Sequence, residues 1–166
     1  MIENDSFYFQ VTDFLVHKKF ILESGLILVK YLLNENRNDD AMELMRRIAD
    51  HDNSKLQKKE FNLLCSIPLH TSSFTDANEK MNSCLEKSIS LHWKHNRHHP
   101  EHFEKIEDMT DIDIMEMCCD WHARSCQYKT DFISFVKTRQ ETRFHFPQEM
   151  FDKILKYCEI LEEGLN

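Results

Sequence analysis

The sequence contains few of the residues that build tight turns. Only two glycines and three prolines occur in 166 residues. Many-stranded sandwiches and barrels need turns with positive φ, for which glycine is the usual residue, whereas long helices joined by short loops do not. We therefore expect an all-α fold, a single-domain helical bundle of about six to seven helices that occupies residues 1–166.

Long apolar runs and an excess of positive charge are also missing. The longest apolar stretch, near Ile27 to Leu33, is interrupted by Lys30 and is too short to cross a bilayer, and no basic-then-apolar leader opens the chain. The formal net charge of −8 argues against bulk binding of nucleic acid or of an anionic membrane. A small phosphorylated substrate remains compatible with this charge. We expect a soluble protein of the bacterial or host cytoplasm.

Cysteine pairs with the spacing of a zinc site or a redox motif are absent too. None of the six cysteines forms a CxxC pair, and the adjacent Cys118 and Cys119 would point to different faces of a helix. We interpret all six as reduced, mostly buried thiols of a cytosol-like compartment.

The apolar spacing and the capping residues predict the order of the helices. We expect a long first helix from Asp5 or Ser6 to about Asn34 and a second helix capped by Asp39 or Asp40. A capping box formed by Ser54 and Gln57 would open the third helix. The remaining expected segments are a helix to residue 64, a loop over 66–75, a helix over about 77–96, a polar segment over 98–110, and helices over about 111–127, 130–143 and 147–163.

The dipeptide His51-Asp52 is the most informative local feature. Neighbours inside a helix point about 100° apart, so two adjacent residues can bind one metal ion only where the helix ends or bends. Asn53 and Ser54 follow at once, and both residue types favour helix ends. The sequence therefore supplies the break that joint ligation of a metal ion by this pair would need.

Three further residues strengthen this interpretation. His17 lies on the core-facing stripe of the first predicted helix, and Asp120 lies within a later helix, where a buried carboxylate is costly unless it is paired or metal-bound. A surface ion pair with Arg124 is the alternative for Asp120. Lys55 follows the pair by one helical turn, where its ammonium could reach a bound phosphate.

The order His17, then His51-Asp52, then Asp120 resembles the HD superfamily of metal-dependent phosphohydrolases. The resemblance implies a helical core in which these four residues hold a divalent metal ion. The stretch from His51 to Lys55 is similar to the HDxGK-type motif of several branches, in which the lysine assists phosphate chemistry. Ser54 replaces the glycine of that motif, which separates this chain from the cyclic-dinucleotide branch.

A closer resemblance covers most of the chain. The sequence looks like an uncharacterised family of bacterial and phage proteins known only as a domain of unknown function. The shared stretches are His17-Lys18, His51 to Lys55 with Glu60-Phe61, Leu91-His92 through Asn96-Arg97-His98-His99, and Glu116 to Trp121.

A block rich in histidine lies between the His-Asp pair and Asp120. In two-metal relatives of the HD superfamily such histidines hold a second ion, and in one-metal relatives they bind phosphate or protonate the leaving group. We expect one of these roles for His92, His98 and His99, and an exposed position for His95 and His102. Asn96 and Arg97, like Lys55, are candidates for phosphate binding or catalysis.

Two residues near Asp120 could support the site. Glu116 lies one turn before Asp120 and could orient a water molecule or a ligand histidine, although a solvated position is the alternative. We expect Trp121 to pack beside the site.

The leading hypothesis is hydrolysis of a phosphate ester in a nucleotide or another small phosphorylated metabolite. Nitrogen and oxygen ligands without thiolate fit Mn, Fe, Co, Ni or Zn, as one or two ions. A di-iron oxygenase and a non-catalytic nucleotide-binding or partner-binding protein are the alternatives. The oligomeric state is left open by the sequence.

Overall fold

The computed structural model describes residues 4–65 and 79–164. Every regular element in these ranges is helical, which confirms the predicted all-α fold. The α-helices of the described ranges are α1 (Asn4–Asn34), α2 (Asn38–Asp50), α3 (Lys58–Leu64), α4 (Glu79–His95), α5 (Asp111–Tyr128), α6 (Phe132–Arg139) and α7 (Gln148–Glu163).

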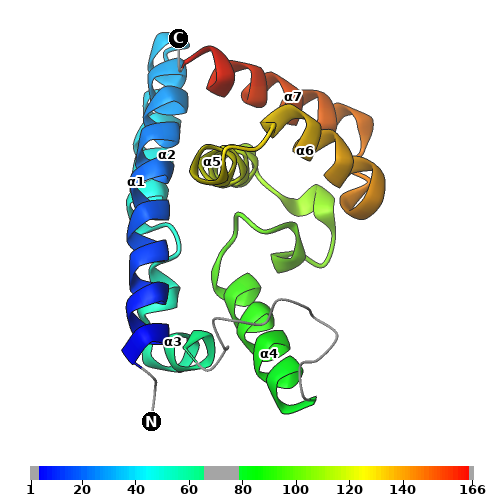
Figure 1. The fold of residues 1–166 in the computed structure, drawn as a ribbon. Coiled ribbons are helices and arrows are strands. Elements are labelled where there is room, and N and C mark those ends of the chain that lie inside the picture. Colours follow the sequence, from blue (N-terminus) through cyan, green and yellow to red (C-terminus); the bar gives the residue numbers. More distant parts are fainter. Residues whose placement is uncertain (1–3, 66–78, 165–166) are drawn as a thin grey trace.

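The helices form two parts, one with α5, α6 and α7 and the other with α3 and α4, and the long α1 runs along both (Figure 1). The long α1 and its neighbour α2 run side by side, and α5 crosses them nearly end-on to the view. In the view of Figure 1, α7 lies above α5 and α6 lies to its right, while α3 and α4 lie below it. The loop that joins α4 to α5 contains two short 3₁₀ turns, Pro100–His102 and Ile106–Asp108, and it runs between these two parts.

The main core lies where α1, α2, α5 and α7 meet. On α1, Ile21, Leu28 and Leu32 are fully buried, and their spacing of seven and four residues places them on one face of the helix. α5 is buried on nearly all sides from Ile112 to Ala123, so polar residues on this helix must find partners inside the protein. The helix therefore brings Asp113, Glu116 and Asp120 into the interior.

Some local predictions differ from the structure because other contacts take the expected caps. The Ser54–Gln57 box does not form: Asn53–Leu56 is a 3₁₀ turn, and α3 begins at Lys58 after Gln57. At the start of α2, Asp40 pairs with Arg37 at 2.7 Å instead of capping the helix. The other differences are that Pro147 precedes α7 as its N-cap, and that α6 ends at Arg139 and passes into a π-helical turn, Gln140–Phe144.

Two further expectations concern the state of the cysteines and the possibility of a membrane-spanning helix. The described cysteines Cys65, Cys118, Cys119, Cys126 and Cys158 are free, and all except Cys126 are buried. Among the described helices, none has both the length and the apolar character that crossing a bilayer requires. The expected loop over 66–75 lies outside the described residues.

Candidate metal centre

The His-Asp pair lies at a sharp break in the backbone. α2 ends at Asp50, and His51 follows with φ −47° and ψ 128°. Asp52 adopts the left-handed conformation, with φ 58° and ψ 10°, which aspartate tolerates better than most residues. The 3₁₀ turn Asn53–Leu56 then continues the chain. This break lets the two adjacent side chains, each about 2% exposed, point into the same interior space.

A first cluster joins α1, the end of α2 and α5. Nε2 of His17 lies 3.4 Å from Nε2 of His51 and 3.0 Å from Oδ1 of Asp120. Nε2 of His51 lies 3.6 Å from the same carboxylate oxygen. Donor atoms placed about 2.1 Å from a common ion are about 3.0–3.4 Å apart in octahedral or tetrahedral geometry. Two of the three separations lie in this range and the third is slightly longer, so the three atoms lie close to the arrangement that ligation of one ion requires.

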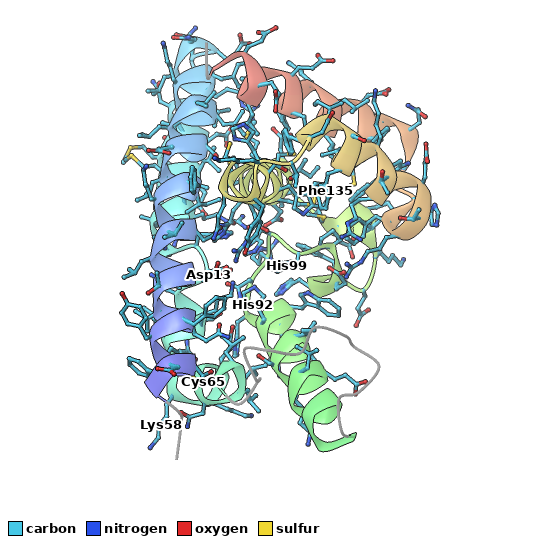
Figure 2. The ribbon with its side chains drawn as sticks, in the orientation of Figure 1. Asp13, Lys58, Cys65, His92, His99 and Phe135 are labelled. Atoms are coloured by element: carbon cyan, nitrogen blue, oxygen red, sulfur yellow. The ribbon has the colours of Figure 1, made fainter. Side chains whose placement is uncertain are left out.

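A second cluster lies beside the first and is centred on Asp52. Oδ1 of Asp52 lies 3.2 Å from Nε2 of His92 and 3.5 Å from Nε2 of His98. His99 completes the group, in which one ligand atom from each residue lies within 4.8 Å of all the others. His92 and His99 are labelled in Figure 2, where the upper end of α4 approaches α5. Oδ1 of Asp52 is also 3.7 Å from Nε2 of His51, so Asp52 connects the two clusters.

Two buried glutamates fix the orientation of the histidine rings. Oε1 of Glu116 lies 3.0 Å from Nδ1 of His51 and 3.3 Å from Nδ1 of His98, and Oε1 of Glu60 lies 2.8 Å from Nδ1 of His92. An ionised carboxylate only accepts hydrogen bonds, so each Nδ1 donates. In the neutral imidazole, Nε2 then carries the lone pair that faces the cluster. Histidines that bind metal ions are commonly held by carboxylates in this way.

Three atoms of the second cluster have no hydrogen-bond partner although they are buried. They are Oδ1 of Asp52, Nε2 of His98 and Nε2 of His99. A buried polar atom without a partner is costly, and three such atoms that face one another are explained most simply by a common cation. The donor set thus fits a divalent metal ion.

The charges around the clusters set the protonation of the histidines. Burial, followed by the charge of His98, lowers the pKa of His99 to about 2, and burial together with His51 lowers the pKa of His98. Both rings are therefore neutral near pH 7. For His51, burial acts in the opposite sense to Asp52, Asp120 and Glu116, and these carboxylates raise its pKa to about 10. The carboxylates therefore favour a positive charge at this place, which a proton on His51 carries when no ion is bound and which a metal ion would supply in place of that proton.

Among the candidates for phosphate binding, Lys55 lies closest to the clusters. Its Nζ is 2.6 Å from Oδ2 of Asp52, and its side chain remains 20% exposed. Asn96 lies after the end of α4 and donates to Oγ of Ser54 at 2.8 Å, so it ties α4 to the 3₁₀ turn. Arg97 instead pairs with Asp113 at 2.9 Å and is half-exposed.

The remaining predicted residues are placed as follows. Trp121 packs into an aromatic group with Phe135, Phe144 and Phe146, within the core. His95 is exposed, as predicted, whereas His102 is only partly exposed. Nδ1 of His102 lies 3.0 Å from the carbonyl oxygen of Trp93.

Several residues that support the centre were missed by sequence analysis. Arg47 on α2 contacts Oε2 of Glu116 at 2.6 Å and Oδ1 of Asp113 at 2.7 Å. Nζ of Lys18 donates to the carbonyl oxygen of His51 at 2.6 Å and so holds the backbone at the break. Glu60, which holds His92, is only 1% exposed. The available signal was that Lys18 and Glu60 both lie within shared stretches, His17-Lys18 and Glu60-Phe61.

Arg124, the alternative partner considered for Asp120, forms an ion pair with a different residue. Arg124 pairs through Nη1 with Oδ2 of Asp13 on α1, at 3.2 Å. Asp120 itself is 9% exposed and faces His17 and His51.

Comparisons with known proteins identify a family but no activity. A family model matches residues 6–163, nearly the whole chain. The chain belongs to the family of unknown function DUF5662. The comparisons with curated proteins and with solved structures gave no match. The DUF5662 match agrees with the expected resemblance to an uncharacterised family, and the match includes every residue of both clusters.

Proposed function

We propose that the two clusters hold a pair of divalent metal ions and that the protein hydrolyses a phosphate ester of a nucleotide or other small metabolite. The observation that carries the proposal is the convergence of buried, unpartnered donor atoms on Asp52, next to the triad of His17, His51 and Asp120. The order of these ligands in the sequence is that of the HD superfamily, which supports the choice of phosphate chemistry.

The second cluster favours two ions over one. His92, His98 and His99 surround Asp52 together, so none of them is set apart as a proton donor. The ligand atoms are nitrogen and oxygen, and among the described residues no cysteine belongs to either group. This chemistry fits Mn, Fe, Co, Ni or Zn.

The residues around the ions would bind and orient the phosphate. Ions bound there lower the pKa of water and withdraw charge from the phosphoryl group. The ammonium of Lys55, next to Asp52, offsets charge on the phosphoryl oxygens. Glu116 and Glu60 keep the imidazoles of His51, His98 and His92 in fixed orientations, so the donor atoms are positioned before the substrate arrives.

The test compares Asp52→Asn with Asp50→Asn, an exposed aspartate two residues earlier that serves as a matched control. Protein purified with Mn²⁺ or Co²⁺ is screened against nucleotides and sugar phosphates for phosphate release. We expect Asp52→Asn to lower kcat/KM by about 100-fold or more and to reduce the metal content, because it removes the carboxylate shared by the clusters. Asp50→Asn should change neither.

Unchanged phosphate release in Asp52→Asn would overturn the proposal. Iron at about two per chain with a visible charge-transfer band and no phosphate release would support a di-iron oxygenase instead. Recovery of an intact bound nucleotide after long incubation with the metal-loaded protein would support a binding protein.

A further inference from the structure

A small cavity opens beside the first cluster and takes no part in metal ligation. Its volume is about 200 Å³, and it is lined by residues of α1, the 3₁₀ turn, α3 and α5. Two of its walls adjoin the metal centre. Lys55 contacts Asp52, and Arg124 lies one helical turn after Asp120 on α5.

Arg124 supplies the cavity with a positive charge next to the first cluster, because it lies one helical turn after Asp120 on α5 and its side chain lines the cavity. Its Nη1 lies 3.2 Å from Oδ2 of Asp13, which lines the same cavity. Asp13 offsets part of this charge, but its carboxylate already accepts from Arg124, Gln127 and Tyr128. Asp13 is labelled in Figure 2 and lies on α1 at about the level of His92 and His99.

The rest of the cavity wall is mostly apolar. Phe14, Leu56, Phe61 and Leu64 line it, together with Gln10, whose side chain donates to the carbonyl oxygen of Leu64 at 3.4 Å. Phe61 is fixed by an edge-to-face contact with Phe7, with ring centroids 5.2 Å apart. The cavity wall therefore combines two cations that adjoin the metal centre with apolar side chains from α1, the 3₁₀ turn and α3. This arrangement suits an anion joined to a compact apolar group.

The size of the cavity limits the ligand further. Sites for drug-sized ligands usually enclose about 300–1,000 Å³. A volume of about 200 Å³ lies below this range, so the cavity accommodates a single ring system but excludes a whole nucleotide.

We propose that this cavity binds the organic group of a phosphate monoester with a compact aromatic or apolar substituent, and that Arg124 binds its phosphate together with Lys55. The inference rests on the proposed phosphate chemistry and narrows its substrate class. Arg124 and Phe61 are the residues that set this specificity.

The test measures binding by calorimetry, so it does not depend on turnover. Benzylphosphonate and methylphosphonate, which resist hydrolysis, are titrated into the Mn²⁺-loaded protein. We expect benzylphosphonate to bind about tenfold more tightly, because burial of the ring removes apolar surface from water. Phe61→Ala should lower this preference about threefold or more. Arg124→Met should weaken both ligands about tenfold, with partial recovery in Arg124→Lys.

Arg139→Met is the matched control, because Arg139 lies on α6 over the ring of Phe135 and outside the cavity. It should leave both affinities unchanged. If Arg124→Met fails to fold, the two ligands and Phe61→Ala still decide the question. Equal affinity for the two phosphonates, or a preference that Phe61→Ala leaves intact, would overturn the cavity assignment.

A parallel assay of phosphate release from phenyl phosphate separates the two proposals. Release without a preference for benzylphosphonate would overturn the cavity assignment and leave the hydrolase proposal standing. The predicted preference without release from any phosphate ester would support the cavity and overturn the hydrolase.

Discussion

At the scale of single residues, Glu116 contacts one histidine of each cluster. One of its oxygens accepts from His51 and His98, and the other contacts Arg47. We expect Glu116→Gln to weaken metal binding about 10–100-fold, because carboxylates that orient ligand histidines contribute about this much to affinity. Calorimetric titration with Mn²⁺ measures the effect, and Glu43→Gln is the control, because the half-exposed Glu43 pairs with Arg46 and belongs to neither cluster. Equal affinity in wild type and Glu116→Gln would contradict the assigned role.

Asp113 is a second single-residue case, and its contribution depends on pH. Burial raises its pKa, but Arg97, Thr110 and Arg47 outweigh this effect and hold the pKa below its ordinary value. The carboxylate therefore stabilises the fold fully above about pH 4, and this contribution is lost as pH falls through the lowered pKa. Asp113→Asn should lower the free energy of unfolding by about 3 kcal/mol near pH 7, because it removes a fully buried carboxylate that pairs with the largely buried Arg47.

Urea unfolding of wild type and Asp113→Asn at several pH values measures this difference. It should shrink steadily below about pH 4, as the wild-type carboxylate also becomes neutral. A difference of the same size at pH 3 and at pH 7 would rule out the ion pair as its source.

At the scale of the helices, α1 and α2 approach closely at Gly25. A Cβ placed there would lie 2.7 Å from both Cγ atoms of Ile48. Gly25→Ala should therefore destabilise the protein by about 1–3 kcal/mol, although alanine alone favours a helix by about 1 kcal/mol. Denaturant unfolding of Gly25→Ala, Ile48→Ala and the double variant forms a mutant cycle. Additivity of the two effects within about 0.5 kcal/mol would show that the contact is absent.

The helices themselves could be predicted because apolar spacing reports local structure. The break after α2 was also predictable, since Asn53 and Ser54 favour helix ends and the break lies at His51. The caps were less predictable: Asp40 pairs with Arg37, a contact that local patterns do not distinguish from a cap. The predicted secondary structure therefore assigned the residues of the first cluster to the correct helices, although it did not give every helix end correctly.

The second cluster depends on tertiary structure, so its residues and their contacts could be predicted only in part from the sequence. α4 ends at His95, and the turn that follows turns His98 and His99 toward Asp52. The position of Arg97 next to His98 in the sequence did not predict where its side chain points, because Arg97 pairs with Asp113. Arg47 and Glu60 act across the fold, and the local sequence gives no indication of their partners.

At the scale of the whole molecule, the proposed metal centre joins segments that are far apart in the chain. The residues of its two clusters come from α1, the break after α2, the end of α4 with the turn beyond it, and α5. Metal ions bound there would cross-link the two parts of the helical bundle that meet at α1. Five of the ten histidines of the chain belong to the two clusters.

Metal stoichiometry tests this account most directly. The purified protein, His17→Gln and His99→Gln are saturated with Mn²⁺, freed of unbound metal and measured by elemental analysis. Because each histidine belongs to a different cluster, the account predicts about two ions per chain in wild type and about one in each variant. A wild-type protein that retains no ion, or variants that retain as much metal as wild type, would contradict it.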